Sequence, residues 1–183
     1  MKKKVNIHIG GFYASRPPAI IDTVLGSCVA VCLLDPVERI GGMNHIFLPG
    51  KADMKHFDDA ARYGVNAMEL LINKMLNLGA NRNRLVAKTF GGGHLIPAIS
   101  KENGIGERNI EFTLEFLERE GIRIISRSLG GNDSKKVYFH TDTGEVFLKR
   151  VRPIHFEKIV REEKRHLGRV RKEARKSGDV DLF

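Results

Sequence analysis

Residues 23–49 constrain the fold most strongly, because they combine a run of apolar residues with two reactive side chains. From Val29 to Leu34 both alternating sets of positions are apolar, which is typical of a strand buried on both faces. Asp35 to Glu38 has the composition of a turn, so a second strand would run back and place Cys28 opposite His45. A bulge at the glycine pair of the second strand would shift this register by a residue or two. We therefore predict two paired strands, with Cys28 at the start of the first and His45 inside the second.

Cys28 and His45 are costly side chains to bury unless they act on each other. An imidazole can take the proton of a thiol, and the resulting imidazolium holds the thiolate, which is the minimum requirement for a cysteine nucleophile. Cys32 lies on the same strand about 13 Å from Cys28, too far for a disulfide, and we interpret it as a small buried apolar residue. The two cysteines also lack the C-x-x-C spacing of redox and zinc sites, so no metal or cofactor is expected. The pattern predicts an enzyme that uses a cysteine nucleophile.

Two glycine-bearing segments are candidates for binding a substrate oxygen. Gly26 and Ser27 come directly before Cys28, and the backbone N–H groups of this tight segment are candidate oxyanion donors. Gly91, Gly92 and Gly93 follow an apolar strand and expose successive N–H groups, which is one way to bind an anion. A tight turn that lets the backbone approach the Cys28 strand explains the triplet equally well. The triplet is not a phosphate loop, because the Gly-Lys-Ser/Thr ending is absent.

The 183 residues are expected to form one domain over residues 1–152 and a C-terminal tail over residues 153–183. Alternation, helical spacing and glycine signals predict an α+β domain. Strands are expected over residues 5–10, 85–90 and 122–126, helices from Asp58 or Asp59 to Leu78 and from residue 105 to about residue 120, and a hairpin of residues 137–140 and 145–149. The loops of residues 51–57 and 91–98 are candidates for substrate contact by their position alone.

The net charge of +9 is concentrated near the C-terminus, since twelve Lys or Arg and only four Glu lie between Lys149 and Lys176. Such a charge run is most often a solvated helix, and otherwise a docking arm for an acidic protein, an anionic membrane or a nucleic acid. Aromatic residues are missing from the basic part, and no nucleic-acid partner is expected. No apolar run is long enough for a signal peptide or a transmembrane segment, so a cytoplasmic location is expected.

Several motifs recur together in an order that is specific to one family. The string LGSCVAVCLLD is followed by GGMNHIFLP, with the histidine seventeen residues after the cysteine, and then by FGGG, IGERN and LGG. In these features the chain resembles the chemoreceptor glutamine deamidases known as CheD over roughly residues 5–150. The resemblance implies a layered α/β sandwich with mostly antiparallel mixed sheets and two main helices, to which this chain adds a basic helical tail.

The resemblance also implies a function. Family members hydrolyse glutamine side-chain amides to glutamate on methyl-accepting chemotaxis receptors, some also act on receptor methyl esters, and many bind the phosphatase CheC. Their functional threonine, cysteine and histidine correspond to Thr23, Cys28 and His45. Asp22 is an alternative to Thr23 as the partner that orients the imidazole, because members differ by one residue in this spacing. A non-catalytic module that docks a CheC-like phosphatase or a receptor array is the alternative function.

Overall fold

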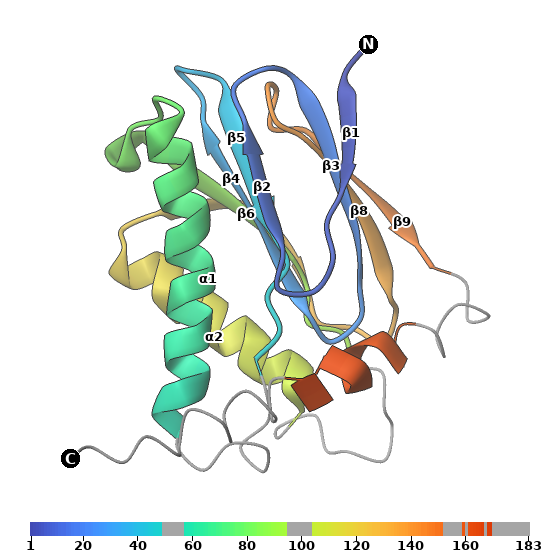
Figure 1. The fold of residues 1–183 in the computed structure, drawn as a ribbon. Helices are drawn as coiled ribbons and strands as arrows, with labels where there is room; N and C mark the ends of the chain where they lie inside the picture. The colour runs from blue at the N-terminus through green and yellow to red at the C-terminus, as the bar shows by residue number, and fades with distance from the viewer. Residues whose placement is uncertain (49–56, 95–103, 152–158, 160, 167, 170–183) are drawn as a thin grey trace.

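The computed structural model describes residues 1–48, 57–94, 104–151, 159, 161–166 and 168–169. This part of the chain forms nine strands in two sheets, with two long helices against one of them (Figure 1). The strands are β1 Lys3–Asn6, β2 Phe12–Ser15, β3 Ala19–Leu25, β4 Val29–Asp35, β5 Ile40–Asn44, β6 Val86–Gly91, β7 Arg123–Leu129, β8 Lys135–His140 and β9 Val146–Arg150. The helices are α1 Phe57–Asn77 and α2 Ile105–Arg119, together with the short 3-10 helix η2 Arg82–Arg84.

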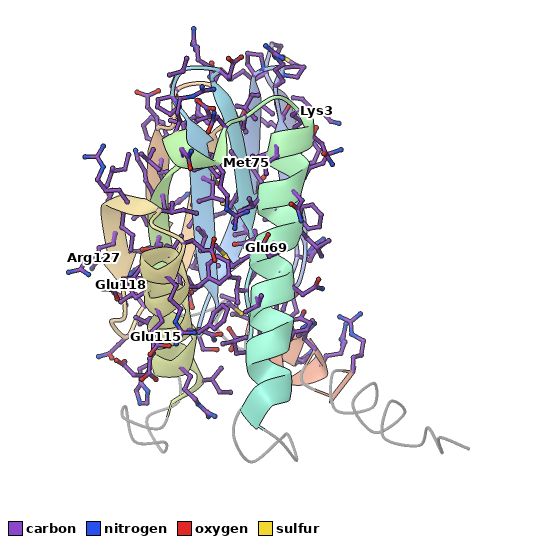
Figure 2. All side chains as sticks on the ribbon, turned by 90° about the vertical axis from the view of Figure 1, so that its left-hand side faces the viewer. Lys3, Glu69, Met75, Glu115, Glu118 and Arg127 are labelled. Atoms are coloured by element: carbon purple, nitrogen blue, oxygen red, sulfur yellow. The ribbon has the colours of Figure 1, made fainter. Side chains whose placement is uncertain are left out.

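The two sheets confirm the predicted layered α+β fold. One sheet has the order β1-β3-β8-β9 and the other has the order β2-β5-β4-β6-β7. The pairs β1–β3 and β6–β7 are parallel and the remaining pairs are antiparallel, so both sheets are mixed and mostly antiparallel. Helices α1 and α2 lie side by side over the five-stranded sheet (Figure 2). The layers are therefore helices, five-stranded sheet and four-stranded sheet.

Strand β4 is buried on both faces, as its apolar pattern predicts. Val29, Val31 and Leu33 belong to the core between the helices and the five-stranded sheet, where α1 contributes an apolar face with helical spacing. The alternate residues of β4 belong to a second core between the two sheets. Cys28 and Cys32 lie on this second side. The candidate nucleophile therefore faces the interior of the sandwich.

The register of the β4–β5 hairpin differs from the prediction by two residues. Cys32 pairs with Met43, and beyond the end of β5 an isolated bridge joins Val29 to Ile46. In this register His45 lies diagonal to Cys28 rather than opposite it, and it follows β5 instead of lying inside the strand. Both side chains still point to the same side of the sheet.

The register shift has a physical cause in the turn. Asp35 pairs with Ile40 as the last residue of β4, so the turn begins one residue later than predicted. The Asp35 carboxylate accepts hydrogen bonds from the backbone N–H groups of Val37 (3.0 Å) and Glu38 (3.2 Å), which fixes the turn from the strand end. Arg39 completes the turn with a φ of 54°.

The first strand is shorter than predicted, because β1 ends at Asn6 rather than at residue 10. Residues 7–11 leave the four-stranded sheet and cross to the five-stranded sheet, where β2 pairs with β5. Gly10 permits the bend with a φ of +79°. Both backbone groups of His45 bond to this crossing segment, since its carbonyl accepts from Gly10 N–H at 2.9 Å and its N–H donates to the Gly11 carbonyl at 3.0 Å. The crossing segment therefore fixes the backbone of His45.

The predicted helices and the final hairpin are confirmed. Helix α1 begins at Phe57, so Asp58 and Asp59 lie in its first turn, and the glycines that follow the two helices, Gly79 and Gly121, have left-handed φ values of 105° and 65°. Strands β8 and β9 form the predicted hairpin. Residues 51–56 and 95–98 of the candidate loops lie outside the described residues. None of the described helices is long and apolar enough to cross a membrane.

A buried carboxylate joins the β4–β5 turn to the 3-10 helix η2. The side chain of Asp35 is fully buried and accepts hydrogen bonds from Arg84 Nη2 and from Asn81 N–H, both at 2.8 Å. Burial raises the pKa of Asp35, but the hydrogen bonds from Arg84 and from backbone N–H groups outweigh it and lower the pKa to about 2. Asp35 is therefore charged and fully paired at neutral pH.

We predict that Asp35→Ala lowers the free energy of unfolding by about 3 kcal/mol, because it leaves several backbone donors and a guanidinium without their acceptor. Urea unfolding monitored by circular dichroism measures this change. Asp133→Ala is the matched control, since its ion pair with Arg150 is exposed on both sides and is worth less than about 1 kcal/mol. Equal stabilities of the two variants would contradict the prediction.

Candidate active site

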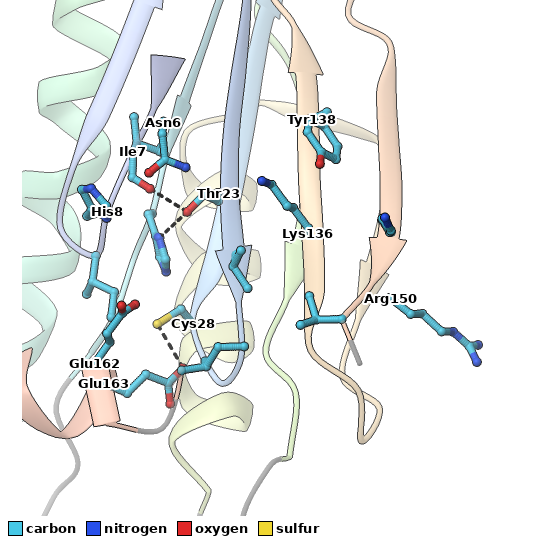
Figure 3. A pocket seen from close by; sticks show the side chains of 16 residues that line it. Asn6, Ile7, His8, Thr23, Cys28, Lys136, Tyr138, Arg150, Glu162 and Glu163 are labelled. Atoms are coloured by element: carbon cyan, nitrogen blue, oxygen red, sulfur yellow. Dashed lines mark hydrogen bonds between the residues drawn. The ribbon is translucent and has the colours of Figure 1, made fainter. Parts of the chain in front are cut away.

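A cavity of about 700 Å³ opens at one end of the layer between the two sheets. It is lined by side chains from both sheets and from the C-terminal segment, among them Thr23, Cys28, His45, Lys136, Tyr138 and Glu163 (Figure 3). The structure therefore brings together in one cavity the threonine, cysteine and histidine that the sequence singles out. They come from β3, from the residue before β4 and from the residue after β5.

The hydrogen bonds of Thr23 determine which ring nitrogen of His45 carries a proton. The Thr23 hydroxyl donates to the carbonyl of Ile7 at 2.8 Å, so its single proton is used. The same oxygen lies 2.8 Å from His45 Nδ1 (Figure 3) and must accept there, which places a proton on Nδ1. The neutral ring then has its lone pair on Nε2.

His45 is buried in a position that keeps the ring neutral. Burial lowers the pKa of His45 to about 3, and the nearby His166 and His8 act in the same direction. Nε2 is buried and makes no hydrogen bond to any residue that the structure describes. A neutral imidazole with an available lone pair is the form that can accept a proton from a thiol.

Asp22, the alternative partner for the imidazole, points away from it. Neighbouring residues on a strand face opposite sides of the sheet, so Asp22 and Thr23 cannot both face His45. The Asp22 carboxylate accepts a hydrogen bond from Asn6 at 2.9 Å and forms an ion pair with Lys136 at 3.2 Å. Of the two candidates, Thr23 is the one that contacts the ring.

Three carbonyl groups hold the segment that carries the thiol. Gly93 N–H donates to the Gly26 carbonyl at 2.8 Å, and Gly92 N–H donates to the Cys28 carbonyl at 2.7 Å. The Asn109 side chain donates to the Ser27 carbonyl at 3.0 Å. With these carbonyls turned toward β6 and α2, the Ser27 N–H is directed toward the cavity, where it donates to Glu163. The segment can therefore offer an N–H group beside the thiol.

The glycine triplet approaches the cysteine segment closely. A Cβ atom added to Gly91 would collide with the Cys28 carbonyl, and one added to Gly92 would collide with the side chain of Ile110. Both glycines also have positive φ angles, +107° and +67°. The Gly92 N–H is already bonded to the Cys28 carbonyl. In this structure the triplet therefore holds the segment that carries Cys28, the candidate nucleophile.

Asn109 also supports the site. The sequence patterns place it at the start of a helix and assign it no role. Its side chain is fully buried, accepts a hydrogen bond from the backbone N–H of Leu48 at 2.7 Å and donates to Ser27. One amide thus joins the segment after His45 to the segment before Cys28. The sequence signal was its place in the IGERN motif, three residues after Gly106, which packs on the glycine triplet.

Glu163 is the second residue that sequence reasoning missed, because it belongs to the charged tail. Its Oε1 atom accepts a hydrogen bond from Ser27 N–H at 2.9 Å and one from the Cys28 thiol at 3.5 Å (Figure 3). Burial raises the pKa of Cys28 well above its ordinary value, and the charge of Glu163 raises it further. Burial also raises the pKa of Glu163, against the effect of these hydrogen bonds. The thiol is therefore protonated in this arrangement.

In the part of the chain that the structure describes, no three or more His, Cys, Asp or Glu side chains are grouped so that they could hold a metal ion. The chemistry that the described arrangement supports is nucleophilic attack by a thiol, proton transfer by a neutral imidazole and stabilisation of an oxyanion by a backbone N–H.

Comparisons with known proteins agree with the motifs. The family model described as CheD chemotactic sensory transduction matches residues 47–150. The chain is 46% identical over 184 residues to a probable chemoreceptor glutamine deamidase CheD 1 of Shewanella oneidensis, covering 100% of this chain and 88% of that protein. It is 43% identical to a CheD 2 of Chromobacterium violaceum (98% and 89% covered) and 41% identical to a CheD of Vibrio vulnificus (95% and 84% covered), each named as a probable chemoreceptor glutamine deamidase.

The depressed pKa of His45 predicts how stability depends on pH. Between the ordinary pKa of 6.5 and the folded value of about 3, the unfolded chain binds a proton that the folded chain does not. The free energy of unfolding should therefore fall as the pH is lowered through this window, by up to about 1.4 kcal/mol per pH unit from this residue. Urea unfolding at several pH values measures the slope, which should become shallower in His45→Gln. An unchanged slope in that variant would contradict the burial of a neutral His45.

Proposed function

The chain belongs to the CheD family, and we propose that it is a protein-glutamine glutaminase that hydrolyses glutamine side-chain amides to glutamate on methyl-accepting chemotaxis receptors. The names of its relatives support the substrate. The observation that carries the proposal is the hydrogen-bond chain from Ile7 through Thr23 to His45, in the same cavity as the Cys28 thiol. It provides a neutral base of defined tautomer for a cysteine nucleophile.

The first step forms a thioester. His45 Nε2 accepts the thiol proton of Cys28, and the thiolate attacks the side-chain carbonyl carbon of the glutamine. The carbonyl oxygen becomes an oxyanion, for which the Ser27 N–H is a donor. When this tetrahedral intermediate collapses, the carbon–nitrogen bond breaks and the imidazolium of His45 protonates the leaving ammonia.

The second step consumes water. Neutral His45 accepts a proton from a water molecule that attacks the thioester carbon. The carbon–sulfur bond breaks, the thiol of Cys28 is restored by that proton, and the product is a glutamate side chain. One water is consumed and one ammonia is released for each glutamine, with no change of oxidation state.

The remaining candidate residues have positioning roles in this proposal. Thr23 holds the ring of His45 and its tautomer, in the way that the third member of a catalytic triad does. Gly26, Gly91 and Gly92 bring the backbone of β6 close enough to fix the cysteine segment. Residues 1–152 would form the catalytic domain and residues 153–183 a separate tail.

We predict that Cys28→Ala lowers the rate of receptor deamidation by at least about 1,000-fold, because the thioester cannot form. The assay incubates the protein with a cytoplasmic receptor fragment and maps glutamine-to-glutamate conversion by mass spectrometry. Cys32→Ala is the matched control, since Cys32 is equally buried on the same face of β4 and has no role in the proposed chemistry.

Two outcomes would decide against the mechanism. Conversion by Cys28→Ala at the wild-type rate would rule out the cysteine nucleophile. Tight binding of a CheC-type phosphatase that Cys28→Ala leaves intact, combined with no turnover by the wild-type protein on any receptor fragment, would favour the non-catalytic binding module instead.

A further inference from the structure

The described part of the C-terminal segment is helical and lies at the mouth of the candidate active site (Figures 1 and 3). Ile159, Glu163 and His166 have the spacing i, i+4 and i+7, so they share one face of the helix. Ile159 and His166 are buried, and Glu163 is half-buried with its carboxylate in the cavity. The segment docks one face and exposes the other, which carries the charged residues Arg161, Lys164 and Arg165, while the exposed Glu162 lies at the edge of the cavity and helps to line it.

His166, on the docked face three residues after Glu163, contacts two side chains of the domain. The ring of His166 packs edge-on against Phe47 with 5.6 Å between centroids, and its Nε2 atom lies 3.4 Å from the hydroxyl of Tyr63. Gly10 leaves room for this contact, because an added Cβ would meet both Tyr63 and His166. These contacts of His166 fix where the helix places the Glu163 carboxylate in the cavity.

The Glu163 carboxylate occupies the position that the proposed reaction assigns to its product. Its Oε1 atom contacts both the Ser27 N–H, the candidate oxyanion donor, and the Cys28 thiol, the candidate nucleophile. Its Oε2 atom accepts from the Ser27 hydroxyl at 2.7 Å. The product of glutamine deamidation is a glutamate side chain, and after thioester hydrolysis its carboxylate would lie between these same groups.

We propose that the C-terminal helix is an intramolecular product mimic, which fills the active site with Glu163 and must leave before a receptor glutamine can enter. This inference rests on the proposed function and adds a means of regulation to it. The chemistry agrees with the geometry, because the charge of Glu163 raises the pKa of the Cys28 thiol while the helix is docked. The helix thus blocks access and also disfavours the thiolate.

The proposal makes a specific prediction for Glu163→Gln. This variant places a glutamine side chain at the nucleophile, so Cys28 should convert it to glutamate by the same thioester steps, consuming one water and releasing one ammonia. Peptide mass spectrometry after purification should find glutamate at position 163. The double variant with Cys28→Ala should retain the glutamine, and so should Lys164→Gln, which places a glutamine on the exposed face of the same helix.

The rate of conversion separates an intramolecular event from one between molecules. It is expected to be independent of protein concentration, and Glu163→Gln combined with Cys28→Ala should stay unconverted when it is mixed with the wild-type protein. Conversion in that mixture, or a Glu163→Gln variant that keeps its new amide beside an intact Cys28, would overturn the proposal.

A second measurement requires no deamidase activity. Alkylation of Cys28 by iodoacetamide should be at least about 10-fold faster in Glu163→Ala than in the wild type, because both the obstruction and the nearby charge are removed. Lys164→Ala, at the adjacent position on the exposed face, should react at the wild-type rate. Equal rates for Glu163→Ala and the wild type would show that Glu163 does not cover the thiol.

The two claims can fail separately. If the wild-type protein and Glu163→Ala both fail to deamidate receptor fragments while Glu163→Ala still speeds alkylation, the proposed function is wrong and the docked helix stands. If receptor fragments are deamidated at the same rate by both proteins and alkylation is also unchanged, the proposed function stands and the product mimic is wrong.

Discussion

The hydrogen bond between Thr23 and His45 is the interaction on which the candidate site depends. It joins the two sheets at their open end, since Thr23 belongs to β3 of the four-stranded sheet and His45 follows β5 of the other. The Thr23 hydroxyl can accept from the ring only because the Ile7 carbonyl takes its proton. That carbonyl is available because the chain leaves the four-stranded sheet after β1 and crosses over the site. The fold therefore sets the protonation of the base through backbone geometry.

The segment that carries the Cys28 thiol is held by α2 and by the turn after β6. Asn109 of α2 and the glycine turn after β6 hold the carbonyls of residues 26–28, and they leave the Ser27 N–H directed into the cavity. The thiol and the imidazole thus approach the same space from two segments that the Asn109 side chain and the Val29–Ile46 bridge join to each other. The C-terminal helix uses that space in the structure, with its docked face in the cavity and its basic residues outside. Arg161, Lys164 and Arg165 are exposed while the inward face is docked.

Local patterns predicted the parts of the fold that depend on local physics. The two-sided burial of β4, the apolar faces of the helices and the glycine stops of α1 and α2 all follow from residue spacing. The register of the β4–β5 hairpin does not follow from residue spacing, because it depends on how the Asp35 side chain binds the turn. Strands β2 and β3 were not predicted because proline and polar residues obscure their alternation. Glu163 could not be found from its surroundings in sequence, since one inward carboxylate in a charged helix resembles its solvated neighbours.

The most direct test of this account is the tautomer of His45, measured by ¹⁵N nuclear magnetic resonance of histidine-labelled protein near neutral pH. The hydrogen-bond chain predicts a neutral ring with a proton on Nδ1 and none on Nε2. Thr23→Val, which keeps the shape of the side chain and removes the hydroxyl, should lose this preference, whereas Thr23→Ser should keep it. A wild-type ring that is protonated on Nε2 alone, or charged at neutral pH, would contradict the claim that Thr23 prepares His45 as the base for Cys28.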